Sequence, residues 1–204
     1  MKNLILVLFF VISQLVFSIE SRVAVEIGDQ VFTSRYIEID RSISEYFIQN
    51  QKIKVSQQVK SIEVKSQEFI IDWLIAQEAK NLKLTSIQPL DIQKYLDEHK
   101  TQIQALEMVK KLEPSDNEIK ESIERVLVSD QYLKVKLQNL SSPISDQDIQ
   151  NYFEKNKNLF DGKKIDNFKE NIKVYLMQQQ LQERLKSWYE SLKRKYKVKI
   201  VTGK

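Results

Sequence analysis

The chain contains few residues that could carry chemistry. Its 204 residues include one histidine, His99, no cysteine and three glycines at positions 28, 162 and 203. Without cysteine there is no thiolate for a zinc site and no cysteine nucleophile, and one histidine cannot form a His-pair metal site. The glycines are too scattered for a phosphate-binding loop. A Ser–His–acid triad through His99 stays formally possible, but we expect no enzyme, no metal and no cofactor.

His99 lies within a stretch of helical spacing, and we expect it at the surface. A role as a pH sensor is the alternative, because the charge of imidazole changes near neutrality. The scarcity of Gly and Pro, together with abundant Lys, Glu, Gln, Leu and Ile, favours a mainly helical chain.

The first eighteen residues have the pattern of a secretory signal peptide. One basic residue, Lys2, precedes the apolar run Leu4–Ile12, and Ser18 with Val16 fits a cleavage site before Ile19. A retained membrane anchor is the alternative, although a spanning helix needs about 20 apolar residues. We therefore expect cleavage and a periplasmic location, with no stable membrane insertion afterwards.

The charge of the exported chain is nearly balanced. The whole sequence carries a net charge of +4, and removing residues 1–18 takes away Lys2 and no acid, leaving +3. This excess is too small to indicate nucleic acid as a partner. The densest basic stretch, Lys193–Lys199, is interpreted as a helix end, where cations are favoured by the helix dipole, in preference to a phosphate-binding patch.

The elements that must position any site are mainly helical, with a small β element at each end. Val23, Val25 and Ile27 alternate before a turn at residues 28–30, which predicts a hairpin completed by Val31-Phe32. Thr33-Ser34 form an N-cap pair for a helix to about Asn50. A second helix is expected from about Gln57 to Asn81, with Phe69, Ile70, Trp73 and Leu74 on its apolar stripe.

Four further segments follow. Thr85 and Gln88 have the spacing of a capping box, which predicts one helix continuing to Pro114. Ser115 with Glu118 opens the next helix, with an apolar seam running from Ile119 to Leu140 that Asp130 interrupts. Ser145 with Asp148 caps a short helix, and a long helix is expected from Asp166 to about Leu192. Residues 196–201 alternate and predict a strand.

Because an isolated hairpin is marginal in water, we expect the C-terminal strand to pair with the N-terminal hairpin. This predicts one domain over residues 19–204, with a core from 22–84 and 166–201 and a helical lobe from 85–165.

The order of these segments resembles the SurA-type periplasmic chaperones and their parvulin-like prolyl isomerase relatives. Residues 23–33 look like the opening strand, turn and cap of that family, and residues 69–79 look like its second core helix. Residues 144–156 resemble the segment that leads into the isomerase domain, and residues 168–200 resemble the closing helix and strand. The resemblance implies a SurA N-terminal-like or trigger-factor-like chaperone core.

The isomerase domain of that family has no counterpart in this chain. It usually stands between the segment of Tyr152 and Phe153 and the closing helix, where only a few residues around Gly162 are found. The resemblance therefore implies an ATP-independent chaperone, or holdase, without isomerase activity. Its clients would be unfolded or partly folded exported proteins, such as outer-membrane β-barrels.

Most large aromatic residues are expected in the core, since Phe69, Trp73, Phe168 and Trp188 recur at helical spacing. Five others lie near helix ends or off the cleanest seams and are candidate client contacts: Tyr46, Phe47, Tyr132, Tyr152 and Phe153. A structural or adaptor protein that binds one envelope partner is the rival hypothesis, and an enzyme is a distant third. A homodimer is also compatible with the sequence.

Overall fold

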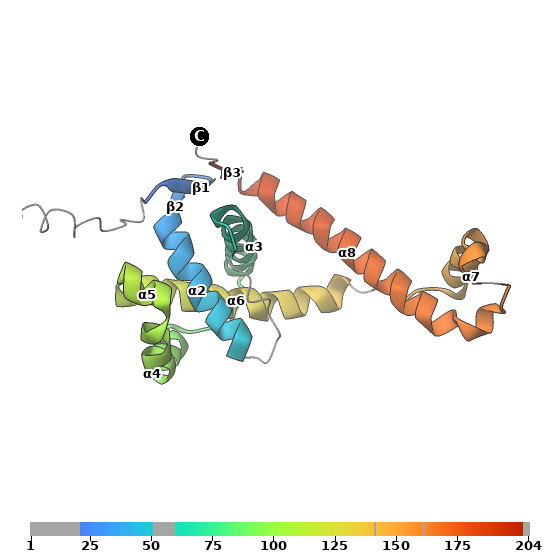
Figure 1. The fold of residues 1–204 in the computed structure, drawn as a ribbon, viewed down its shortest axis with the longest axis horizontal. Coiled ribbons are helices and arrows are strands. Elements are labelled where there is room, and N and C mark those ends of the chain that lie inside the picture. The colour runs from blue at the N-terminus through green and yellow to red at the C-terminus, as the bar shows by residue number, and fades with distance from the viewer. Residues whose placement is uncertain (1–20, 51–59, 141, 161, 202–204) are drawn as a thin grey trace, which may run out of the picture.

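The computed structural model describes residues 21–50, 60–140, 142–160 and 162–201. Within these ranges the chain is mainly helical and carries one small three-stranded antiparallel sheet, as expected (Figure 1). The proposed signal peptide, residues 1–18, falls outside the described residues. None of the helices in the described part of the chain has the length and apolar character that a membrane crossing requires.

The sheet joins the two ends of the described chain. Its strands are β1 (Val23–Ile27), β2 (Gln30–Thr33) and β3 (Val198–Ile200), in the order β2-β1-β3. Ile27 pairs with Gln30 across the turn and with Val198 of β3. Gly28 has a φ of 59°, the left-handed conformation that a two-residue hairpin turn requires. The predicted pairing of the C-terminal strand with the hairpin is confirmed.

Two helices cover the sheet, α2 (Ser34–Asn50) and α3 (Ile62–Asn81). Their apolar residues pack around Phe69, which is fully buried with Val25, Ile37 and Leu74. The predicted cap of α2 is confirmed, since the Thr33 hydroxyl accepts a hydrogen bond from the Tyr36 N–H at 3.3 Å. The start of α3 lies later than the expected Gln57, because Ser61 is its N-cap. Residues 51–59 lie outside the described ranges.

The predicted helix from Thr85 to Pro114 is wrong in two respects. It is two helices, α4 (Pro89–Ala105) and α5 (Glu107–Leu112), because Leu106 has an extended backbone with ψ 133°. The helix also begins later than Thr85. The Asp91 carboxylate accepts from the Gln88 N–H at 2.8 Å, which caps the helix there. The Thr85 hydroxyl accepts from the Ile87 N–H ahead of the helix and donates to Gln131 of another helix.

The helix α6 (Asp116–Leu140) packs directly against α2, α3 and α4. Its predicted start is confirmed, because Ser115 and Glu118 exchange the hydrogen bonds of a capping box. The first part of its seam, Ile119, Ile123 and Val126, is buried against α2 and α4, as the spacing predicts.

The last helices extend away from this body. The short α7 (Asp146–Lys155) packs on the beginning of α8 (Lys169–Lys195), around buried Ile149 and Ile172. α8 then runs back to the sheet, where Leu192 joins the cluster around Phe69 (Figure 1). A 3₁₀ turn, Ile165–Asn167, precedes α8, so the helix starts three residues after the expected Asp166.

The helices of residues 85–165 belong to different apolar clusters. α4, α5 and α6 share apolar clusters with α2 and α3, while α7 shares one with α8 alone. The single domain over residues 19–204 stays a prediction.

Candidate functional site

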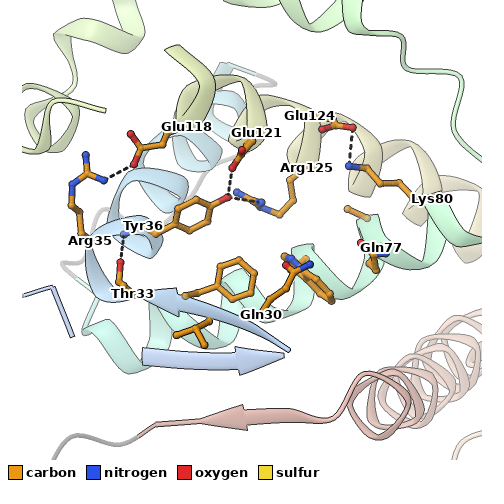
Figure 2. Close-up of a pocket in the computed structure, with 14 residues that line it drawn as sticks. Gln30, Thr33, Arg35, Tyr36, Gln77, Lys80, Glu118, Glu121, Glu124 and Arg125 are labelled. Carbon is orange, nitrogen blue, oxygen red and sulfur yellow. Dashed lines mark hydrogen bonds and ion pairs between the residues drawn. The ribbon is translucent and has the colours of Figure 1, made fainter. Parts of the chain in front are cut away.

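A cavity of about 520 Å³ opens between the sheet and three helices (Figure 2). Its walls come from β2, the first turn of α2, the second half of α3 and the first half of α6. The lining residues are Gln30, Val31, Phe32, Thr33, Arg35, Tyr36, Trp73, Ala76, Gln77, Lys80, Glu118, Glu121, Glu124 and Arg125.

The cavity follows the edge of the sheet. All four residues of β2, from Gln30 to Thr33, line it. Successive side chains of a strand point to opposite faces, so a cavity over one face would meet alternate residues only. Contact with four consecutive residues places the cavity along the strand edge that faces away from β1. Figure 2 draws the residues that line it.

Aromatic rings form the apolar part of the wall. Phe32 packs edge-on against Phe69 with ring centroids 4.8 Å apart, and it also contacts Tyr36 and Trp73. Trp73 is only partly buried: it packs on the core and also lines the cavity. Its predicted core position is therefore correct, but the ring keeps a face that a ligand can reach.

Paired charges form the polar rim. Arg35 bonds Glu118, and Lys80 bonds Glu124 at 2.7 Å. Burial opposes ionisation of Glu118, yet hydrogen bonds from Arg35 and Ser115 outweigh it and lower the pKa of this carboxyl. The Tyr36 hydroxyl donates to Glu121 at 3.0 Å.

A buried ionic network stands behind the rim. Asp40 of α2 is fully buried and accepts from Arg41 and from Arg125 of α6. Burial raises the pKa of Asp40, but the two guanidinium groups outweigh that effect and hold the pKa below its ordinary value. Arg125 also donates to the Tyr36 hydroxyl at 3.2 Å, which fixes that ring at the cavity wall.

A second cavity of about 360 Å³ adjoins the first across α6. Its lining includes Pro89, Ile92 and Lys120, and it shares Glu121 and Glu124 with the first cavity. The two hollows therefore meet at a pair of carboxylates. Together they offer aromatic surface, a strand edge and acids, which suits the binding of an elongated ligand.

The predicted contact residues do not line this cavity. Tyr46 and Phe47 pack on α4, where the Tyr46 hydroxyl is 2.8 Å from Nδ1 of His99. Phe47 is 5% exposed and belongs to the core around Ile43 and Ile123. His99, expected at the surface, is half-buried and contacts the rings of Tyr46, Phe47 and Tyr95.

The other three candidates lie in two further places. Tyr132 is 4% exposed and packs edge-on against Trp188. Tyr152 and Phe153 belong to the cluster of α7 and α8, where both rings contact Phe160. The five residues are thus distributed over three separate apolar clusters.

Sequence reasoning missed the residues that do come together. Glu118, Glu121 and Glu124 recur at three-residue steps, a spacing that also occurs on any solvated helix face. They become a cavity wall only because α6 packs against α2 and α3, so no local signal could have identified them.

Among the described residues, no group of three or more His, Cys, Asp or Glu side chains could hold a metal ion. The lining of the cavity is consistent with binding of a polypeptide or another elongated polar and apolar ligand. Searches of the sequence against protein-family models and against curated proteins find no significant match.

Proposed function

We propose that the protein is a periplasmic, ATP-independent holdase with a SurA-type chaperone core and no isomerase domain. It binds unfolded or partly folded segments of exported proteins, including outer-membrane proteins. The observation that carries this proposal is the cavity of about 520 Å³ along the free side of β2, with Phe32, Tyr36 and Trp73 on its wall.

The lining of the cavity suits clients of varied sequence. Aromatic faces accept many apolar side chains, and the backbone edge of a strand can bond any extended segment. The rim residues Gln77 and Lys80 have long, partly exposed side chains that can adjust to different clients. Contacts of this kind are individually weak, which lets a client leave without an energy source.

The arrangement of the ends also supports a SurA-type core. The hairpin of β1 and β2 pairs with β3, which follows the long helix α8, in the order that the family resemblance implies. Helices that lie between β2 and β3 in the chain, α2, α3 and α6, form the other walls of the cavity.

The test is the breadth of aggregation suppression. We expect the purified protein to suppress the aggregation of several unrelated outer-membrane proteins diluted from urea. Gln77→Trp, which fills the cavity, should abolish most of this effect. Gln179→Trp, which puts the same side chain on an exposed part of α8, should leave it unchanged.

Two outcomes would contradict the proposal. Binding to one folded partner without any suppression of aggregation would favour an adaptor protein. A robust rate in a prolyl isomerisation assay would show that the chain has the activity that the proposal denies.

A further inference from the structure

We infer that the cavity takes its client as an added β-strand: an extended segment pairs with the outer edge of β2 and places a lysine or arginine against Glu121. The inference rests on the proposed function and adds to it the mode of binding and the chemistry of the segment.

The outer edge of β2 presents backbone groups toward the cavity. The Ser34 N–H donates to the Arg22 carbonyl at 2.8 Å. The backbone N–H and C=O groups of the even-numbered residues in this segment therefore point toward β1. Backbone groups alternate in direction along a strand, so the N–H and C=O of Val31 and the N–H of Thr33 point the other way. No strand within the described ranges pairs with that side of β2.

The two edges of the sheet differ in protection. The other edge strand, β3, carries Lys199, whose side chain is 74% exposed, and Lys197 precedes it. Exposed lysines are a common device against unwanted strand pairing. β2 has the sequence Gln-Val-Phe-Thr, with no proline and no charge, and Val31 is 56% exposed. The edge strand that lines the cavity therefore has no proline or charged residue of its own to prevent strand pairing.

The space beside β2 runs along the whole strand. A four-residue segment paired with β2 would extend about 13 Å at a distance of roughly 4.8 Å from it. The cavity contacts all of β2, and α3 and α6 form its far wall. Beyond Glu121 and Glu124 the second cavity would receive the continuation of the segment.

Glu121 sets the chemistry of the segment. Of the three rim acids on α6, Glu118 bonds Arg35 and Glu124 bonds Lys80. In the contacts of the described residues, the Glu121 carboxylate accepts from the neutral Tyr36 hydroxyl and is otherwise exposed. It stands where the two cavities meet, so a cationic side chain of the segment would lie beside it.

The first test removes backbone hydrogen bonding from the ligand. The probe is a fluorescent ten-residue peptide of alternating valine and threonine with one central lysine. N-methylation of its four central residues keeps the side chains and removes their N–H donors. We expect the methylated peptide to bind at least about tenfold more weakly, the effect of losing one or two hydrogen bonds and of the steric block.

The second test changes the protein. Val31→Pro removes an N–H that points into the cavity and no bond within the sheet, and proline is compatible with an edge strand. It should weaken binding of the unmodified peptide to the same extent, whereas Val31→Thr should not. Circular dichroism should show the same helical content for both variants.

The third test concerns charge. Glu121→Gln should weaken binding about twofold to fivefold, as for an exposed ion pair, and replacing the peptide lysine by norleucine should do the same without adding to it. Glu183→Gln, on exposed α8, is the matched control.

Equal binding of the methylated and unmodified peptides would overturn strand addition while leaving the holdase intact. Strand addition would also be overturned if the unmodified peptide did not bind while the protein still suppressed aggregation. If the wild-type protein itself did not suppress aggregation, the proposed function would be contradicted.

Discussion

Arg125 and Asp40 lie 85 residues apart in the sequence and are joined in the interior, where Nε of Arg125 donates to Oδ1 of Asp40 at 2.9 Å. A second bond from the same guanidinium completes the pair. The guanidinium also lies over the rings of Tyr36 and Phe69, at 5.4 and 5.0 Å from their centroids. This pair fastens α6 to α2 and so fixes the distance between two walls of the cavity.

Arg125→Met should be strongly destabilising. It leaves the fully buried Asp40 with Arg41 as its remaining cationic partner, and breaking a buried pair typically costs about 3–5 kcal/mol. Urea unfolding followed by circular dichroism measures the loss. Lys186→Met, at an exposed position of α8, is the control and should change stability little. A loss below about 1 kcal/mol for Arg125→Met would contradict the structural role of the pair.

The stability that Asp40 contributes should depend on pH. Burial raises its pKa, but Arg125 and Arg41 outweigh burial and lower the folded-state pKa below the ordinary 3.8. A lowered pKa means that the contribution is fully present above the unfolded pKa and is lost as pH falls through the folded value. The difference in the free energy of unfolding between wild type and Asp40→Asn should thus be constant above about pH 5 and shrink below about pH 4. A difference that does not change with pH would contradict this assignment.

Gly28→Ala should destabilise the sheet through backbone strain. Gly28 has φ +59°, and an added Cβ would meet only the Tyr196 carbonyl oxygen at 3.8 Å, so the cost is conformational and not a clash. We expect a loss of about 1 kcal/mol, measured by thermal unfolding. Gly28→Asn should cost less, because asparagine tolerates the left-handed conformation better than alanine. Equal losses for the two variants would contradict this explanation.

Phe47→Ala should act on stability. Its side chain is 5% exposed and packs with Ile43 and Ile123, so its removal leaves a cavity in the core. A loss of about 3–5 kcal/mol is expected from urea unfolding. Phe153→Ala, at a half-buried position of the smaller α7 cluster, should cost less. If Phe47→Ala kept full stability and lost client binding, Phe47 would be a client contact, as the sequence predicts.

Local patterns predicted most elements. The alternation of Val23, Val25 and Ile27 and the capping pairs at Ser115 and Ser145 specify structure within a few residues, and these elements are found where expected. The break at Leu106 was not predictable, because the apolar spacing continues through it from Ile103 to Val109.

Local sequence patterns do not predict the site. Asp40 and Arg41 are charged residues on a helix, a pattern that ordinarily indicates a solvated face. They are buried because Arg125 of α6 and Asp72 of α3 pair with them. Phe47 and Tyr132 lie off the cleanest seams but are covered by α4 and by Trp188. Burial in both cases depends on contacts between distant segments.

Client binding at the edge of β2 can be measured by amide hydrogen exchange of the purified protein, with and without an unfolded outer-membrane protein held in dilute urea. We expect the client to slow exchange in β2, with the Val31 amide included, and in the cavity walls of α3 and α6. Exchange in α7 and the adjoining start of α8 should not change. Protection confined to α7 and α8, or no protection anywhere, would contradict client binding at the edge of β2.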